Sequence, residues 1–242
     1  MISNELKLEK QASSRSLGVF SRIDWLGWIA IVSLTIALFA IFILAPTERI
    51  QGVVQRLFYF HVTFAYLAYA SFVMVLVASV LYLLKRSMRI DNWARSSAEV
   101  GVMFISLNLI TGIFWMRQVW GAWWTWDPRL TTTLILWFIY AAYLMLRSYA
   151  GDDHRGAAFG SVIGIFGAAM IPIVHFSVVW WRSIHPEPTV IREDGPAMPA
   201  AMIVTMFITI VAFSIVYVYL LRTRLRIEDL REKLSEIHET RV

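Results

Sequence analysis

Six long stretches of this sequence contain no Asp, Glu, Lys or Arg, and they restrict the possible fold more than any other feature. They are residues 25–47, 57–84, 100–116, 130–146, 157–181 and 198–221. A helix needs about 20 mostly apolar residues to cross the hydrocarbon core of a bilayer, and each stretch has roughly this length. Alternation of apolar and polar residues with a period of two, the pattern of a membrane β-barrel, is absent. The sequence therefore predicts an all-α membrane protein, with six transmembrane helices in one bundle over residues 23–221.

Positive charge is distributed unevenly between the two sides of such a bundle. Of the 22 Lys and Arg residues, sixteen fall in the two tails and in the loops at 85–97 and 147–156, and six fall in the other three loops. Cytoplasmic loops of membrane proteins are enriched in Lys and Arg. We therefore expect both termini in the cytoplasm, the three Arg-poor loops on the outer face, and a multi-pass protein of the bacterial inner membrane. The net charge of +5 then reflects topology and contact with membrane lipid, not a nucleic-acid partner.

The two tails and the absence of cysteine set further limits. Residues 1–22 are polar and form an N-terminal cytoplasmic tail, whereas the apolar residues of 222–242 recur every three to four positions and predict a C-terminal amphipathic helix. The chain contains no cysteine. Disulfide chemistry, cysteine-ligated metal sites and thioether-linked haem are therefore excluded.

A segment rich in tryptophan occupies the second outer loop, at residues 115–131. Five of the eleven tryptophans fall within twelve residues: Trp115, Trp120, Trp123, Trp124 and Trp126. An aromatic belt at the membrane interface would spread such residues over all helix ends. If the segment is helical, Trp120, Trp123 and Trp124 share one face and form a flat aromatic shelf. Such a shelf suits a planar, largely apolar ligand, which it would hold by stacking and by burial of surface area.

Charged residues flank the tryptophans. The Asp127-Pro128 pair precedes an apolar run, so Asp127 is expected to cap the N-terminus of the fourth helix. Arg129, one turn further, joins Arg56 and Arg117 as a third guanidinium group near the outer surface. These groups suit the carboxylates of a ligand, although simple extension of each arginine toward the surface is the competing interpretation.

Two of the five histidines lie inside charge-free membrane stretches. An ionisable side chain at such a position predicts a functional site. Counted at about 1.5 Å per residue, His61 and His175 lie at similar depths below the outer surface, roughly 6 Å and 9 Å. Each shares a helix face with small residues, which mark the packed side of a membrane helix. We therefore expect both imidazoles to point into the bundle near its outer side.

The number of available ligands favours one kind of metal group. Zinc would need further protein ligands, and the outer half of the bundle offers no cysteine and no well-placed carboxylate. Haem needs only two axial ligands, because the porphyrin supplies the other four. His61 and His175, lying under the aromatic shelf, therefore predict non-covalent bis-histidine haem b. The alternative is that each histidine simply forms a hydrogen bond between helices.

The same residues resemble a known family. The W-G-x-W-W-x-W-D-x-R-L-T string at residues 120–131 is similar to the signature of the WWD-domain proteins, which handle haem during cytochrome c maturation. The R-x-x-Y-x-H element at 56–61 and the P-I-x-H-x-S-V-x-W-W element at 172–181 narrow the resemblance to the haem exporter protein C family. The similarity covers nearly the whole chain.

The resemblance implies a function without catalysis. Such proteins bind haem at the outer face and present it to a periplasmic haem chaperone, and they work with the membrane and ATPase subunits of an ABC transporter complex and a small single-helix membrane subunit. By position, His61 and His175 would be the axial ligands, with Arg56 and Arg129 near the propionates. The resemblance implies a haem-facing platform made of Trp115, Trp120, Trp123, Trp124, Trp126 and Asp127.

Two other functions remain open at this point. One is the WWD subunit of a two-protein cytochrome c synthase. The other is an electron-transfer membrane cytochrome with structural bis-histidine haem. The helix count and the element at 172–181 favour the chaperone-loading function over the first, and a single pair of histidines near one face speaks against the second.

Overall fold

The computed structural model describes residues 24–150, 153–186, 195 and 198–239, and helices make up nearly all of them. No β-strand occurs in these ranges, and their one isolated bridge joins Glu48 and Gly52. Within the same ranges, six helices are long and apolar enough to cross a membrane. The predicted all-α fold with six membrane-spanning helices is thereby confirmed.

The first helix, α2, spans Trp25–Phe39 and continues as a π-helical turn, Ala40–Leu44. A short 3-10 turn, Val53–Arg56, leads into α3, Leu57–Lys85. The remaining helices are α4 (Met88–Trp120), α5 (Pro128–Ala150), α6 (His154–Trp180) and α7 (Ala200–Glu239). The amphipathic helix expected at 222–242 is the direct continuation of α7, and the expected N-terminal tail lies outside the described residues.

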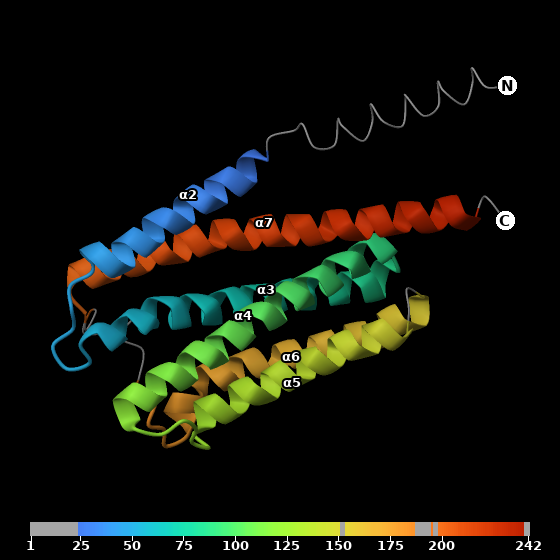
Figure 1. The fold of residues 1–242 in the computed structure, drawn as a ribbon. Coiled ribbons are helices and arrows are strands. Elements are labelled where there is room, and N and C mark those ends of the chain that lie inside the picture. Colours follow the sequence, from blue (N-terminus) through green and yellow to red (C-terminus); the bar gives the residue numbers. More distant parts are fainter. Residues whose placement is uncertain (1–23, 151–152, 187–194, 196–197, 240–242) are drawn as a thin grey trace.

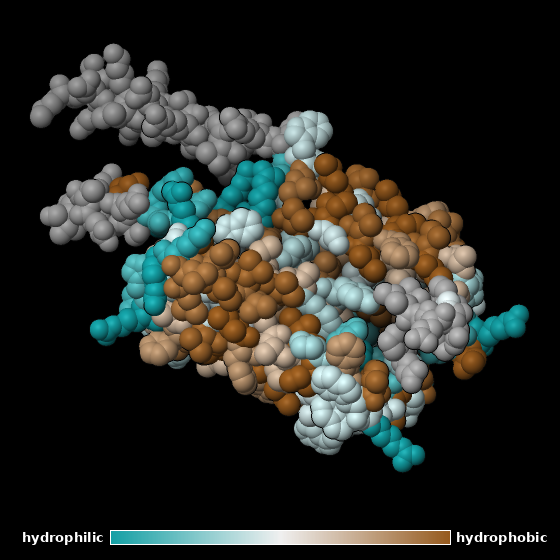
Figure 2. Space-filling view, turned by 180° about the vertical axis from the view of Figure 1, so that it is seen from behind, coloured by the Kyte–Doolittle hydropathy of each residue, from teal (hydrophilic) through white to brown (hydrophobic). Residues whose placement is uncertain are grey.

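The helices lie side by side in pairs, α2 with α7, α3 with α4, and α5 with α6, and α3 also packs against α6 (Figure 1). The start of α2 and the last turns of α7 lie at one end of the bundle, where Arg222 Nη1 is 3.3 Å from Asp24 Oδ1. We call this the terminal end. The loops at 45–52, 121–127 and 181–186 lie at the other end, which we call the loop end (Figure 1). Apolar residues cover much of the side of the bundle, and hydrophilic residues gather mainly toward its ends (Figure 2).

Glycines in α6 allow large side chains of α5 to pack deep in the bundle. A Cβ added at Gly160 would lie 2.7 Å from Cδ of Arg147, and one added at Gly167 would lie 2.9 Å from the Tyr140 ring. Tyr140 in turn stacks on Phe72 of α3, with ring centres 3.7 Å apart and planes 4° from parallel. Small residues on α6 therefore bring α3, α5 and α6 into close contact, as is usual for helices that associate in lipid.

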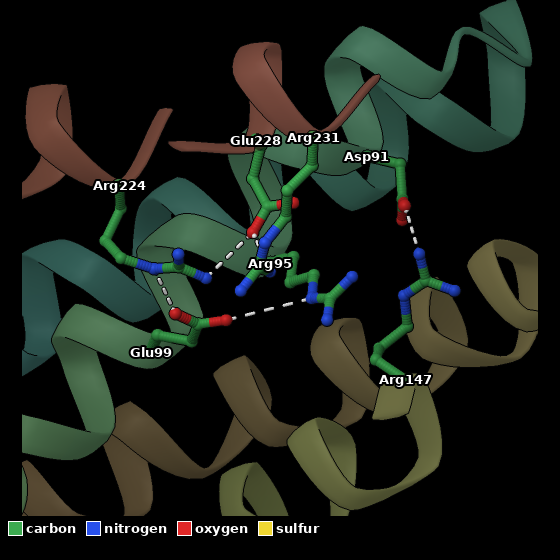
Figure 3. A network of polar contacts seen from close by, with 7 residues as sticks. All are labelled: Asp91, Arg95, Glu99, Arg147, Arg224, Glu228 and Arg231. Carbon is green, nitrogen blue, oxygen red and sulfur yellow. Dashed lines mark hydrogen bonds and ion pairs between the residues drawn. The ribbon is translucent and has the colours of Figure 1, made fainter. Parts of the chain in front are cut away.

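Ion pairs connect the helices at the terminal end (Figure 3). Arg147 of α5 donates to Asp91 of α4 across 2.5 Å, and both side chains are 1% exposed. Nearby, Arg224 of α7 pairs with Glu99 of α4 and with Glu228 of its own helix. Because α4 and α5 also flank the loop at 121–127, the Asp91–Arg147 pair joins these two helices at the end opposite that loop.

We predict that Arg147→Met lowers the free energy of unfolding by about 3–5 kcal/mol, because it removes the buried cation that pairs with the Asp91 carboxylate. The double variant Asp91→Leu/Arg147→Met should recover most of this loss, since no charge is then left buried. Thermal or denaturant unfolding of the purified protein in detergent measures both effects.

The exposed pair of Asp24 and Arg222 provides the matched control. Arg222→Met should cost less than about 1 kcal/mol, because solvent screens an exposed ion pair. Equal losses from Arg147→Met and Arg222→Met would contradict a special role for the buried pair.

Candidate functional site

His61 lies near the start of α3 at the loop end, and its imidazole contacts α4. Its Nδ1 atom is 3.0 Å from the backbone oxygen of Asn108 and 3.3 Å from Thr111 Oγ1. A carbonyl oxygen can only accept, so Nδ1 carries the hydrogen and donates it. Nε2 then carries a lone pair, as in a metal-ligating histidine, and the Asn108 amide nitrogen lies 3.5 Å from it. The prediction that His61 points into the bundle is confirmed.

The Asn108 side chain and two further residues of α4 complete the surroundings of His61. The Asn108 side chain donates to the backbone oxygen of His61 over 2.9 Å. A Cβ added at Gly112 would lie 2.8 Å from His61 Cε1, so only glycine leaves room for the ring. The Trp115 ring meets the imidazole edge-on at 5.7 Å between ring centres, and its Nε1 donates to Gln51. We call Asn108, Thr111, Gly112 and Trp115 the His61 seat.

The His61 seat was only partly predicted from the sequence. Trp115 was expected as part of the haem platform, whereas Asn108, Thr111 and Gly112 were not expected as site residues. Their spacing could have predicted that they act together, because positions 108, 111, 112 and 115 fall on one face of a helix. The sequence does not show which histidine such a face would meet.

The imidazole of His185 lies close to that of His61. Their ring centres are 6.4 Å apart, with the planes 34° from parallel. His185 is half-buried in the loop after α6. Burial is the main cause that lowers the pKa of His185, and the positive charge of Arg129 acts in the same direction. His185 is therefore neutral at neutral pH, which is the state that can bind a metal.

His175 lies elsewhere. Its side chain is exposed on α6, and its backbone oxygen accepts a hydrogen bond from Arg129 Nη2 at 2.6 Å. The prediction that the His175 imidazole points into the bundle is therefore wrong. Val174 and Ser177 occupy the packed face of α6, and a step of about 100° per residue turns the intervening His175 away from it.

Asp127 caps α5 as predicted, and its carboxylate also holds a second segment. Oδ1 accepts from the backbone N–H of Arg129 at 2.9 Å, in the first turn of α5. Oδ2 accepts from Ser183 Oγ at 2.7 Å and from the backbone N–H of Ile184 at 2.8 Å. Asp127, only 7% exposed, thus joins the tryptophan segment to the loop that contains His185.

The tryptophan segment at 115–131 is not one continuous helix. α4 ends at Trp120, because Gly121 adopts a left-handed conformation with φ of 75°, and residues 121–127 form a loop. The prediction that Trp120, Trp123 and Trp124 share one helical face is therefore wrong. Trp120, Trp123 and Trp126 are exposed, and Trp126 lines a shallow hollow of about 230 Å³ together with Trp181.

Several buried donors at the loop end have no acceptor within the described ranges. They are Nε of Arg56, Nε of Arg129 and Nε1 of Trp124. Arg129 also acts electrostatically on both His61 and His185. Arg117 differs, because its guanidinium donates to the Gly121 backbone and lies 5.5 Å from the Trp123 ring. N–H groups without acceptors on these guanidinium and indole side chains, at the end of the bundle that holds both imidazoles, fit an anionic, metal-containing ligand such as haem with its propionates.

The fold and this site define a polytopic membrane protein that gathers two imidazoles, arginines and exposed indoles at one end of its bundle. Comparisons with known proteins give the family. The family model described as Heme exporter protein C matches residues 9–239. The chain belongs to the heme exporter protein C family.

Curated relatives carry the same name. Heme exporter protein C of Bradyrhizobium diazoefficiens is 31% identical over 225 residues, which cover 93% of this chain and 85% of the relative. The Escherichia coli K12 protein of that name is 34% identical over 179 residues, 73% of this chain and 72% of the relative. The Haemophilus influenzae protein is 32% identical over 188 residues, which cover 78% and 76%.

We predict that Gly112→Ala weakens haem retention about tenfold, because the added methyl group displaces the His61 ring at a cost of about 1–3 kcal/mol. The haem content of the purified protein, measured by absorbance, tests this. Gly27→Ala in α2 is the control, since its new Cβ would lie 3.3 Å from the Tyr219 ring, far from the site. Parent haem content in Gly112→Ala would show that the ring does not need this space.

Proposed function

We propose that this protein binds haem at the outer face of the bacterial inner membrane and presents it to a periplasmic haem chaperone during cytochrome c maturation. The observation that carries the proposal is the pair of imidazoles of His61 and His185. A bond from a metal to a histidine nitrogen is about 2 Å long, so two imidazoles on opposite sides of one ion have ring centres about 6 Å apart. The observed separation is 6.4 Å.

This proposal assigns the second axial position to His185 in place of His175. His175 was predicted as that ligand from its depth in the membrane, but its side chain is exposed on α6. His185 is the histidine whose ring lies beside that of His61. His175 stays the alternative second ligand, and the first experiment below separates the two.

Other residues at the loop end would hold the rest of the haem. Arg129, and Arg56 from the 3-10 turn before α3, have buried Nε atoms that lack acceptors in the described chain and would bind propionates. Trp120, Trp123 and Trp126 expose indole rings that would cover an apolar porphyrin surface. Trp115 and Trp124 would support the platform from its less exposed side, and Asp127 would join it to the His185 loop.

Transfer requires that haem is held without a covalent bond. His61 and His185 would hold the iron by exchangeable bonds, and no catalytic step on the protein is needed. The outer-face location rests on the bias of Lys and Arg toward the terminal end. By family membership, the expected partners are the membrane and ATPase subunits of an ABC transporter complex and a small single-helix membrane subunit.

We predict that His61→Ala and His185→Ala each reduce haem retention, because each removes one axial bond, whereas His175→Ala retains most of it. Added imidazole should partly restore binding in the first two variants by occupying the vacated position. Absorption spectra of the purified proteins, with and without reductant, measure both effects. A parent spectrum in His185→Ala together with haem loss in His175→Ala would make His175 the ligand.

Transfer is tested by adding the purified haem chaperone to the haem-loaded protein. Haem that leaves for the chaperone supports presentation. Haem that stays bound while the iron is reduced and reoxidised would instead indicate an electron-transfer cytochrome.

We predict that alanine at Trp123 and Trp124 lowers haem retention more than alanine at Trp25 and Trp28. The first two indoles lie at the proposed site, where stacking contributes on the order of 1 kcal/mol per ring, whereas the second pair lies at the start of α2. Haem content per purified protein compares the two double variants. Equal loss from both would indicate that the tryptophans only anchor the protein at the membrane interface.

A further inference from the structure

The two proposed haem ligands are held in different ways. His61 belongs to α3, and four residues of α4 surround its ring. His185 lies in an irregular loop after the end of α6, and its ring nitrogen Nδ1 contacts only the adjacent backbone oxygen of Pro186, at 3.1 Å, among the hydrogen bonds of the described chain. The orientation of His185 therefore depends on what holds this loop.

Two hydrogen bonds hold the loop to Asp127 at the start of α5, and a third lies within the loop. Ser183 Oγ donates to Asp127 Oδ2 and accepts from the backbone N–H of His185 at 3.0 Å. The Ile184 N–H donates to the same carboxylate oxygen. Hydrogen bonds to an ionised carboxylate are roughly twice as strong as those between neutral groups. One buried carboxylate and one hydroxyl thus connect α5 to the backbone of His185.

We propose that Asp127 and Ser183 form a clasp that positions His185 for the iron and makes His185 the ligand that gives way during haem transfer. The proposal rests on the proposed haem function. It adds that the site opens on the side of His185. His61 stays in place because it belongs to α3 and its ring packs against α4. His185 moves with a loop that has no secondary structure, so a partner needs only to break the clasp to free one face of the haem.

Asp127→Asn separates the clasp from the helix cap. Asparagine caps helices as well as aspartate does, so the bond to the Arg129 N–H is retained. Its amide NH₂ cannot accept from the Ile184 N–H, so the clasp is broken. Ser183→Ala removes the hydroxyl from the other side of the clasp, whereas Ser183→Thr keeps it and serves as the conservative control.

The experiment loads each purified variant with haem and records its absorption spectrum, its haem off-rate to excess apomyoglobin, and carbon monoxide binding after reduction. We expect Asp127→Asn and Ser183→Ala to lose the six-coordinate spectrum in part, to release haem about tenfold faster and to bind carbon monoxide more readily. Added imidazole should restore the spectrum, and Ser183→Thr should behave like the parent. Membrane insertion and protein yield should be unchanged.

Double variants show whether the effect passes through His185. Ser183→Ala should cause no additional increase in the haem off-rate in a His185→Ala background. In a His61→Ala background it should cause its full increase. Parent spectra and off-rates in both clasp variants, or equal additional loss in the His185→Ala background, would overturn the clasp alone. A parent protein that binds no haem would overturn the proposed function as well.

Discussion

The absence of water in the bilayer interior is the constraint on which the rest of this structure depends. Every backbone polar group there must find its partner within the protein, so the chain crosses the membrane only as helices. In the described part of the chain, irregular backbone is confined to the helix ends. The candidate site accordingly lies at the loop end, which holds the 45–52, 121–127 and 181–186 segments.

Two modes of packing divide the bundle along its length. Toward the terminal end, glycines of α6 admit Tyr140, Tyr143 and Arg147 of α5, and the buried Asp91–Arg147 pair joins α4 to α5. At the loop end, the loop at 121–127 links α4 to α5. Its last residue, Asp127, accepts hydrogen bonds from the segment after α6. A closely packed terminal end thus supports a loop end where one proposed ligand, His61, lies in a helix and the other, His185, lies in a loop.

Much of the candidate site was predictable because its chemistry is visible in short segments. A histidine in an apolar helix, a run of tryptophans and an Asp-Pro helix start each have a local physical meaning, and His61 and Asp127 were found in this way. The errors arose where local periodicity was extended too far. Gly121 ends α4 before the tryptophans can share a helical face, and the packing of α6 through Val174 and Ser177 turns His175 outward.

The six spans and the bias of positive charge follow from the sequence alone, because the bilayer selects apolar length regardless of which helices become neighbours. The sequence alone does not show which side chains come into contact. The Asn108 carbonyl meets His61 across 47 positions, and Asp127 meets Ser183 across 56. Such pairs form only after the helices pack. Their approach depends on how each helix is rotated and on small residues at the contacts, and the apolar length of a segment specifies neither of these.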